Sequence, residues 1–380
     1  MRTVQVGECA QVINGFAFKS NLFTIERRGL PIARIRDVSR GRSETYYTGD
    51  YPTSAVIQNG DLLIGMDGEF NIARWQGGRA LLNQRVCKIE ALSGRSDISY
   101  LHYALPVVLK RIEDRTPFVT VKHLSSEDLK EEPILLPDLS EQKRIAELLE
   151  QADRLRRSRR YALELSDSLL PAAFLNIFGD PVKNERDWQK ASLDSIAMKI
   201  TDGEHLNPEF VAEGLPIVMA EQVEELGVNL RTCKLVSTED FTKFVKKCDP
   251  KAGDILIVSR GATIGRTCVV NTERPFCLMG SVILIKLDSI VVDPHFLAAQ
   301  LKSASFVRIL RTTSGASAQQ AIYIAHLKDK FVIVPPLTRQ KRFTDLVGRI
   351  ERLRSVQQES LRQADHLFQS LLHRAFAAKD

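Results

Sequence analysis

The chain has 380 residues, of which 26% are charged and 44% hydrophobic, and its formal net charge is +6. This length suffices for two or three domains with their own cores, and the mildly basic balance permits nucleic-acid binding without requiring it. No stretch approaches the roughly 18 apolar residues of a membrane span, and the N-terminal residues lack the apolar run of a secretion signal. We therefore expect a cytoplasmic protein without membrane contacts.

The first part of the chain, residues 1–138, is predicted to be a β-rich domain. Short apolar runs such as LPIARI, GDLLIGM and LLNQRVCKI alternate with Gly, Asn and Asp. Runs of this length between turn residues are typical of strands. One helix is predicted at about 98–112. The cysteines form no CxxC pair, so we expect buried or incidental thiols rather than a zinc site.

Residues 139–185 are predicted to contain a long helix and a linker. Apolar side chains recur at steps of three and four, which is typical of a coiled coil. Ser140 stands where a helix cap is expected, and Gly179 and Pro181 end the pattern. The predicted seam is Ile145, Leu148, Ala152, Leu155, Ala162 and Leu169.

Residues 186–336 form a second predicted β-rich domain, with the strand-like runs DILIVSR and SVILIKL and a helix at about 294–311. Residues 337–380 are predicted to form a second long helix that begins at Thr338. The predicted seam of that helix is Phe343, Leu346, Ile350, Leu353, Ala364, Leu367 and Leu371.

The two halves of the chain are copies of one pattern. LKEEPILLPDLSEQKR at 129–144 returns 198 residues later as LKDKFVIVPPLTRQKR, and GDLLI at 60–64 returns as GDILI at 253–257. A repeat this long indicates duplicated domains rather than a solenoid. The matching SLL segments at 168–170 and 370–372 lie at different distances from the QKR motifs, which predicts about one extra turn in the second helix.

These elements predict an α+β fold with a pseudo-twofold internal repeat, in which two β-rich domains are separated by two long spacer helices. A helix with one apolar stripe needs a partner, and the nearest partner for each spacer is the other one, packed antiparallel. This arrangement predicts that Leu155 and Leu353 are buried.

Three motifs resemble parts of catalytic sites. Asn207-Pro208-Glu209-Phe210 lacks the glycine loop of a methyltransferase, and GATIG at 261–265 lacks the GK[ST] of a phosphate-binding loop and is predicted to be a tight turn. Asp138, Glu141 and Lys143 could hold a catalytic metal, but the second copy has neither acid, which favours a role at the start of the helix.

The layout of the chain resembles the specificity subunits of type I restriction–modification systems. The residues that carry this resemblance are the LPxLxEQKRI entry to the first spacer, the FGDP exit and the GDILIVSRGATIG segment. The resemblance covers essentially the whole chain. It implies two target-recognition domains, each of which reads one half of a bipartite double-stranded DNA site.

The same resemblance implies that this chain is a non-catalytic subunit with no cofactor of its own. Modification (methyltransferase) subunits would dock on the helices and restriction (translocase and nuclease) subunits would join them, so that S-adenosylmethionine, ATP and Mg²⁺ would belong to these partners. A coiled-coil scaffold without a DNA role and a fused nuclease or methyltransferase are the alternatives.

Bases are read by side chains whose donors and acceptors match base edges. The two halves differ where such side chains are richest, so the halves should read different sequences. Candidate DNA contacts in the first half are Lys19, Arg34, Arg36, Asn71, Arg74, Trp75, Gln76, Arg79, Asn83, Gln84 and Arg85. Those in the second half are His205, Asn207, Gln222, Arg260, Thr263, Arg266, Ser317, Gln319 and Gln320.

Overall fold

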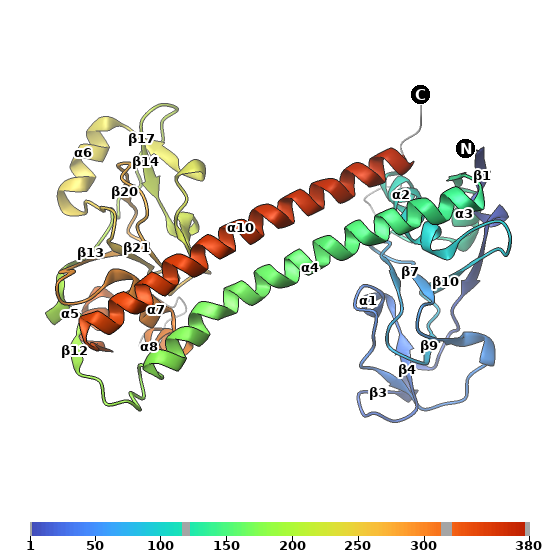
Figure 1. Cartoon of the computed structure of the whole chain (residues 1–380), viewed down its shortest axis with the longest axis horizontal. Helices are drawn as coiled ribbons and strands as arrows, with labels where there is room; N and C mark the ends of the chain where they lie inside the picture. Colours follow the sequence, from blue (N-terminus) through green and yellow to red (C-terminus); the bar gives the residue numbers. More distant parts are fainter. Residues whose placement is uncertain (1, 116–121, 313–320, 377–380) are drawn as a thin grey trace. The chain divides into compact units, whose positions relative to one another are not determined.

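The computed structural model describes residues 2–115, 122–312 and 321–376. The chain forms two compact units (Figure 1), and two long helices, α4 (Leu139–Phe178) and α10 (Leu337–Phe376), each contribute to both. Unit 1 comprises Met1–Arg159 and Ser360–Asp380, and unit 2 comprises Arg160–Glu359. We describe each unit by itself.

Unit 1 contains three β-sheets. A four-stranded antiparallel sheet has the order β2-β10-β7-β8, a second sheet has the order β3-β5-β4-β9-β6, and β1 pairs with β11. The strands are β1 (Arg2–Gln5), β2 (Ala10–Asn14), β3 (Phe23–Thr24), β4 (Leu30–Ala33), β5 (Tyr46–Tyr47), β6 (Val56–Ile57), β7 (Leu62–Gly65), β8 (Ile72–Arg74), β9 (Ala80–Leu82), β10 (Val86–Ala91) and β11 (Pro133–Leu136).

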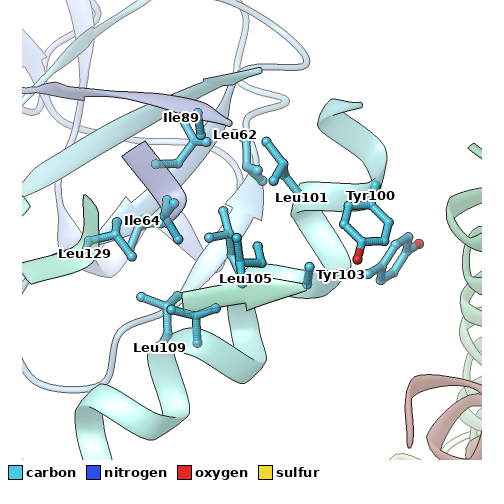
Figure 2. Close-up of a cluster of buried hydrophobic side chains, with 14 of the residues drawn as sticks. Leu62, Ile64, Ile89, Tyr100, Leu101, Tyr103, Leu105, Leu109 and Leu129 are labelled. Atoms are coloured by element: carbon cyan, nitrogen blue, oxygen red, sulfur yellow. The ribbon is translucent and has the colours of Figure 1, made fainter. Parts of the chain in front are cut away.

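Helix α2 (Ile98–Arg115) covers the four-stranded sheet of unit 1. Its side chains at Leu101, Leu105 and Leu109 recur every four residues and face the strand residues Leu62 and Ile64 (Figure 2). This spacing places them on one face of the helix, and their burial forms the main core of the unit. The short α-helices of this half are α1 (Ile35–Val38) and α3 (Ser126–Glu131), and its 3-10 helices are η1 (Val6–Glu8), η2 (Ser20–Leu22) and η3 (Thr53–Ala55).

Unit 2 repeats the four-stranded sheet and part of the second sheet. A four-stranded sheet has the order β13-β21-β18-β19, a three-stranded sheet has the order β17-β14-β20, β12 pairs with β22, and β15 pairs with β16. The strands are β12 (Lys190–Ser192), β13 (Ala197–Asp202), β14 (Leu215–Val218), β15 (Val223–Glu224), β16 (Gly227–Val228), β17 (Lys234–Val236), β18 (Ile255–Val258), β19 (Thr267–Val269), β20 (Cys277–Leu278), β21 (Val282–Leu287) and β22 (Phe331–Ile333).

The shorter helices of unit 2 are α5 (Leu193–Ile196), α6 (Thr238–Lys247), α7 (Pro294–Lys302), α8 (Ala304–Thr312) and α9 (Ile324–Lys328). The prediction of a single helix at 294–311 is therefore wrong, because two helices, α7 and α8, occupy this segment. Ser303 has an extended backbone with ψ near 143°, and its N–H bonds to the carbonyl of Gln300, which ends α7 before α8 begins.

The predicted α+β repeat is confirmed by the matching strand orders of the two units. Even the parallel pairing of β4 with β9 has its counterpart in the parallel pairing of β14 with β20. The predicted glycine turns are confirmed as well, because Gly261 and Gly265 have φ of 96° and 86°. Gly179, with φ of 78°, directly follows the last residue of α4.

The predicted seams of the two long helices are partly wrong. Leu155 and Leu353 are 41% and 44% exposed, and Leu148, Leu169 and Leu367 are similarly exposed. One row of buried or half-buried positions on α4 is instead Gln142, Ile145, Leu149, Ala152, Arg156, Leu163, Ser166, Leu170, Ala173 and Ile177. Each has an inward counterpart 198 residues later on α10, namely Gln340, Phe343, Val347, Ile350, Arg354, Leu361, Ala364, Phe368, Leu371 and Ala375.

This series takes steps of three and four, as a coiled-coil seam does, apart from one step of seven after Arg156 and the matching step after Arg354. In unit 1 the start of α4 packs with the end of α10, where Arg156 stacks over the ring of Phe368 at 4.0 Å. In unit 2 the end of α4 packs with the start of α10, where Phe174 meets Phe343 at 5.6 Å. The predicted antiparallel pairing is therefore confirmed within each unit.

Two further predictions about the helices are corrected. The extra turn predicted for the second helix is absent between residues 337 and 376, because α4 and α10 each contain 40 residues there and keep the 198-residue offset throughout. Ser140 is not the cap of α4. Asp138 is, since its Oδ1 accepts hydrogen bonds from the N–H of Glu141 at 3.0 Å and from the Ser140 hydroxyl at 2.6 Å. Thr338 likewise lies inside the first turn of α10.

The glutamine of the QKR motif makes matching hydrogen bonds in both copies of the repeat. Gln142 is fully buried. Its Nε2 donates to the carbonyls of Pro137 at 2.9 Å and Arg95 at 3.0 Å, and its Oε1 accepts from the N–H of Asp97 at 2.9 Å. Gln340 makes the matching bonds to Pro335 at 2.7 Å and Asp293 at 2.8 Å. In each unit this side chain joins the start of a long helix to the loop before the domain's main helix.

No helix among the described residues is long and apolar enough to cross a membrane. The cysteines are free thiols, of which Cys233 is half-buried and Cys9, Cys87, Cys248, Cys268 and Cys277 are buried. This agrees with the prediction of buried or incidental thiols.

The corrected seam predicts a contrast between two substitutions on α10. Phe343→Ala removes a buried ring and should lower the free energy of unfolding by about 3–5 kcal/mol. Leu353→Ala removes an exposed side chain and should cost less than about 1 kcal/mol. Urea titration of the two variants beside the unmodified chain measures both values. Equal losses would place Leu353 in the core and contradict the corrected seam.

Candidate nucleic-acid interface

Each unit presents a hairpin tip held by the same backbone bonds. In unit 1 the tip follows β7, where the Met66 N–H donates to the Arg85 carbonyl at 2.9 Å and the Leu124 N–H donates to the Met66 carbonyl at 2.7 Å. In unit 2 the tip follows β18, where Ser259 makes the corresponding bonds with Ser281 at 2.8 Å and Ile322 at 2.9 Å. The two tips therefore occupy equivalent positions on the same backbone arrangement, which we call the shared frame.

The tip of unit 1, residues 66–71, carries an ionic cluster. The carboxylate of Asp67 meets Nδ1 of His123 at 2.6 Å and the guanidinium of Arg85 at 3.4 Å. The side chains of His123 and Arg85 are 52% and 50% exposed, so both lie at the surface. Asn71 and Gln84 are exposed nearby, and Asn83 is half-buried with its Oδ1 accepting from the Gln84 N–H.

The tip of unit 2, residues 259–266, is basic. Arg260 is exposed and Thr263 is half-buried. Arg266 is half-buried and donates to the carbonyl of Val223 at 3.3 Å. Ile264 is buried and anchors the tip, as Phe70 does in unit 1. The predicted contacts Arg260, Thr263 and Arg266 thus lie together on one loop.

A second surface of unit 1 is an arginine-lined hollow of about 540 Å³ beside α1. The N–H of Gln76 donates to the carbonyl of Gly41 at 2.8 Å, which joins the end of β8 to the loop after α1. The hollow is lined by Arg36, Asp37, Arg40, Gly41, Arg42, Glu44, Thr45 and Gln76. The sequence reasoning included Arg36 and Gln76 but missed Arg40 and Arg42, although these two arginines follow Arg36 closely in the sequence.

The strand-like run LPIARI predicts a strand through residues 34–36. In the structure the strand ends before them, because residues 35–38 form the short helix α1. Arg34 is half-buried and donates to the Thr45 hydroxyl, with its guanidinium 5.9 Å from the ring of Phe23. Arg34 therefore supports the loop, whereas Arg36 lies at the rim of the hollow. Lys19 and Arg79 lie in other loops of the same unit.

Three predicted contacts have structural partners within their own unit. Trp75 is 1% exposed and its indole N–H donates to the Gly78 carbonyl at 2.7 Å. Gln222 is 2% exposed and its Oε1 accepts from the Met219 N–H at 3.1 Å. We correct both to core residues. Arg74 is half-buried and donates to the Ser99 hydroxyl at 2.8 Å, so only part of its side chain faces solvent.

His205 of unit 2 lies beside the end of β13, in a cluster with Asp202 and Lys247. Its Nε2 lies 2.7 Å from Asp202, which also accepts from Lys247 at 2.9 Å. Partial burial would raise the pKa of Asp202, but the hydrogen bonds from Lys247 and His205 outweigh it and hold that pKa below its ordinary value. Asn207 is exposed nearby. Ser317, Gln319 and Gln320 lie outside the described residues.

The nuclease-like residues at the start of α4 have a structural role. Asp138 caps the helix, and Glu141 accepts two hydrogen bonds from Arg144 at 2.7 and 2.6 Å. The Ser140 hydroxyl is the main cause that holds the pKa of Asp138 below its ordinary value. This arrangement accounts for both acids without a metal.

A model of the type I restriction modification DNA specificity domain matches residues 1–164 and again residues 185–361. The two matches divide the chain at the internal repeat. The chain belongs to the type I restriction–modification DNA specificity family.

Relatives in this family cover nearly the whole chain. This chain is 31% identical over 409 aligned residues to the type I restriction enzyme EcoBI specificity subunit of Escherichia coli. The alignment covers 98% of this chain and 85% of that protein. It is 20% identical to the MjaVIII specificity subunit of Methanocaldococcus jannaschii, over 85% of this chain and 80% of that one.

Solved structures of the family share the fold. The S subunit of a type I restriction–modification system from M. genitalium matches with a TM-score of 0.64 and 17% identity, covering 100% of this chain and 96% of that one. A chain from a study of complex assembly in a type I system matches with a TM-score of 0.58 and 20% identity, covering 99% and 97%. These likenesses agree with the predicted fold class.

Proposed function

We propose that this chain is the DNA-reading subunit of a type I restriction–modification complex and that each unit reads one half of a bipartite site. The observation that carries this proposal is the pair of equivalent hairpin tips, which share one backbone frame but bear different polar side chains. A common frame with different side chains is what two related modules need in order to read different bases. The two long helices, continuous through both units, would fix the gap between the half-sites.

The arginine-lined hollow of unit 1 fits the DNA backbone better than a base edge. Arg36, Arg40 and Arg42 converge there, and guanidinium groups bind phosphate oxygens in a bidentate manner. Contacts of this kind position a protein on the duplex without reading sequence. In unit 2 the exposed residues Lys243, Lys246 and Lys247 of α6 offer a comparable charge.

We expect the double substitution Arg40→Ala/Arg42→Ala to weaken DNA binding to every sequence alike. Each lost phosphate contact should reduce the slope of log K against log salt by about 0.9. Fluorescence anisotropy of the full chain with duplex DNA at several salt concentrations measures this slope. Arg28→Ala is the matched control, because Arg28 is 79% exposed and pairs with Glu26 away from the hollow. A slope that falls equally in the control would argue against the hollow.

Exchange of one domain should alter one half of the recognised site. We expect the full chain to enrich a two-part motif from random duplex DNA. Replacement of residues 186–336 by the equivalent segment of a relative should change one half of that motif only, and replacement of residues 1–138 should change the other half. Sequencing of the enriched DNA identifies both halves. Changes in both halves after either exchange would contradict independent reading.

The exposed leucines of the long helices support a docking role. Leu148 and Leu155 of unit 1 return 198 residues later as Leu346 and Leu353 of unit 2. Of these four side chains only Leu346 is partly covered, and the other three are exposed. The basic pairs of the QKR motifs are exposed in both copies too. Repeated surface residues fit two copies of one partner, which we propose to be the modification subunit, with restriction subunits joining the complex.

In this proposal the chain contributes recognition and spacing, and it performs no chemistry. S-adenosylmethionine, ATP and Mg²⁺ would be bound by the partner subunits. The capping role of Asp138 and the ion pair of Glu141 support this division, because the acids that resemble a nuclease site have other tasks.

Leu155→Glu should reduce the number of bound modification subunits from two to one per chain, because a charge then replaces an apolar contact in unit 1 only. Leu353→Glu should do the same through unit 2, and the double variant should bind neither. Native mass spectrometry of the assembled complex counts the subunits. Gln151→Glu adds the same charge at an exposed position of α4 and should leave the count at two. Two bound copies on the double variant would rule out this surface.

A further inference from the structure

One position of the shared frame carries opposite charges in the two units. Asp67 forms an isolated antiparallel bridge with His123, and Arg260 forms the same bridge with Ala321. Both residues come directly after the residue whose N–H and carbonyl lock the tip to its neighbours, Met66 in unit 1 and Ser259 in unit 2. Asp67 and Arg260 therefore occupy the same backbone site.

The side chains around this site differ between the units. Basic side chains flank the acidic Asp67, whereas uncharged side chains flank the basic Arg260. In unit 1, Arg85 and His123 flank the carboxylate of Asp67, and both contact its Oδ1. Within the described part of the chain no hydrogen bond reaches Oδ2. In unit 2 the corresponding flanking positions hold Ser281 and Ala321, which carry no charge, and Arg260 is exposed. No ion pair to Arg260 occurs among the described residues.

The chemistry of the two groups selects different bases. A guanidinium donates two parallel hydrogen bonds to O6 and N7 of guanine, whereas a carboxylate accepts a hydrogen bond from the N4 amino group of cytosine. The flanking Arg85 and His123 hold one oxygen of Asp67, which leaves the other to accept from a base. The exposed Arg260 side chain can present both of its donors.

We propose that Asp67 and Arg260 are specificity-determining residues, with Arg260 selecting a guanine in one half-site and Asp67 selecting a cytosine in the other. This inference rests on the proposed DNA-reading function and assigns bases to one position of each unit. It also separates the tips, which read bases, from the arginine-lined hollow, which holds phosphates.

The test uses the full chain and selection from random duplex DNA, followed by sequencing and by binding measurements on single-base variants of the motif. Arg260→Ala should lower the preference for guanine at one position of one half-site by about tenfold or more. Arg260→Lys keeps the charge but loses the bidentate geometry, so it should weaken that preference while general affinity stays near that of the unmodified chain. Asp67→Asn should alter a cytosine position of the other half-site only.

Arg274→Ala and Asp50→Asn are the matched controls, since both residues are exposed in other loops of units 2 and 1. They should leave the motif unchanged, and thermal unfolding should show that all variants fold like the unmodified chain. An unchanged motif in Arg260→Ala with uniformly weaker binding would make Arg260 a phosphate contact and overturn the inference. An unmodified chain that enriches no motif would instead overturn the proposed function itself.

Discussion

The buried glutamine at the start of each long helix is the interaction on which the rest of the structure depends. Gln142 and Gln340 are fully buried and hydrogen-bonded on both ends of their amides. A buried amide without partners would cost about 1–3 kcal/mol for each unpaired group, so the loop and the helix are held in one relative position. Because each loop leads into a helix that covers the central sheet, the orientation of each domain on its long helix follows from this bond.

This fixed frame allows the surface to vary. The same backbone bonds hold the tips of both units, and the buried side chains of Phe70 and Ile264 anchor them. The position held by the half-buried Asp67 in unit 1 and by the exposed Arg260 in unit 2 can then change charge without a change in fold. Surface substitutions away from buried networks usually alter stability by less than about 0.5 kcal/mol. A recognition protein built in this way can acquire a new target by changing tip residues alone.

The long helices show where sequence reasoning succeeded and where it failed. The starts expected near Ser140 and Thr338 agree within one residue with α4 and α10, because the apolar periodicity and the preceding prolines were clear. The face was misjudged at Leu155 and Leu353. Each helix carries a second row of leucines one position before the inward row, and periodicity alone cannot say which row meets the other helix. The inward row includes Arg156 and Arg354, whose charged side chains interrupt the apolar periodicity of that row.

The sequence by itself determined the duplication, the β-rich domains, the two spacer helices and the family, because these depend on the order and spacing of residues along the chain. Only the tertiary structure showed that Trp75 and Gln222 belong to the core, since burial depends on residues distant in sequence. It also decided that Asp67 and Arg260 share one site. That equivalence arises from strand register, in which segments far apart in the chain bond to one another, and the drifting offset between the two halves conceals it.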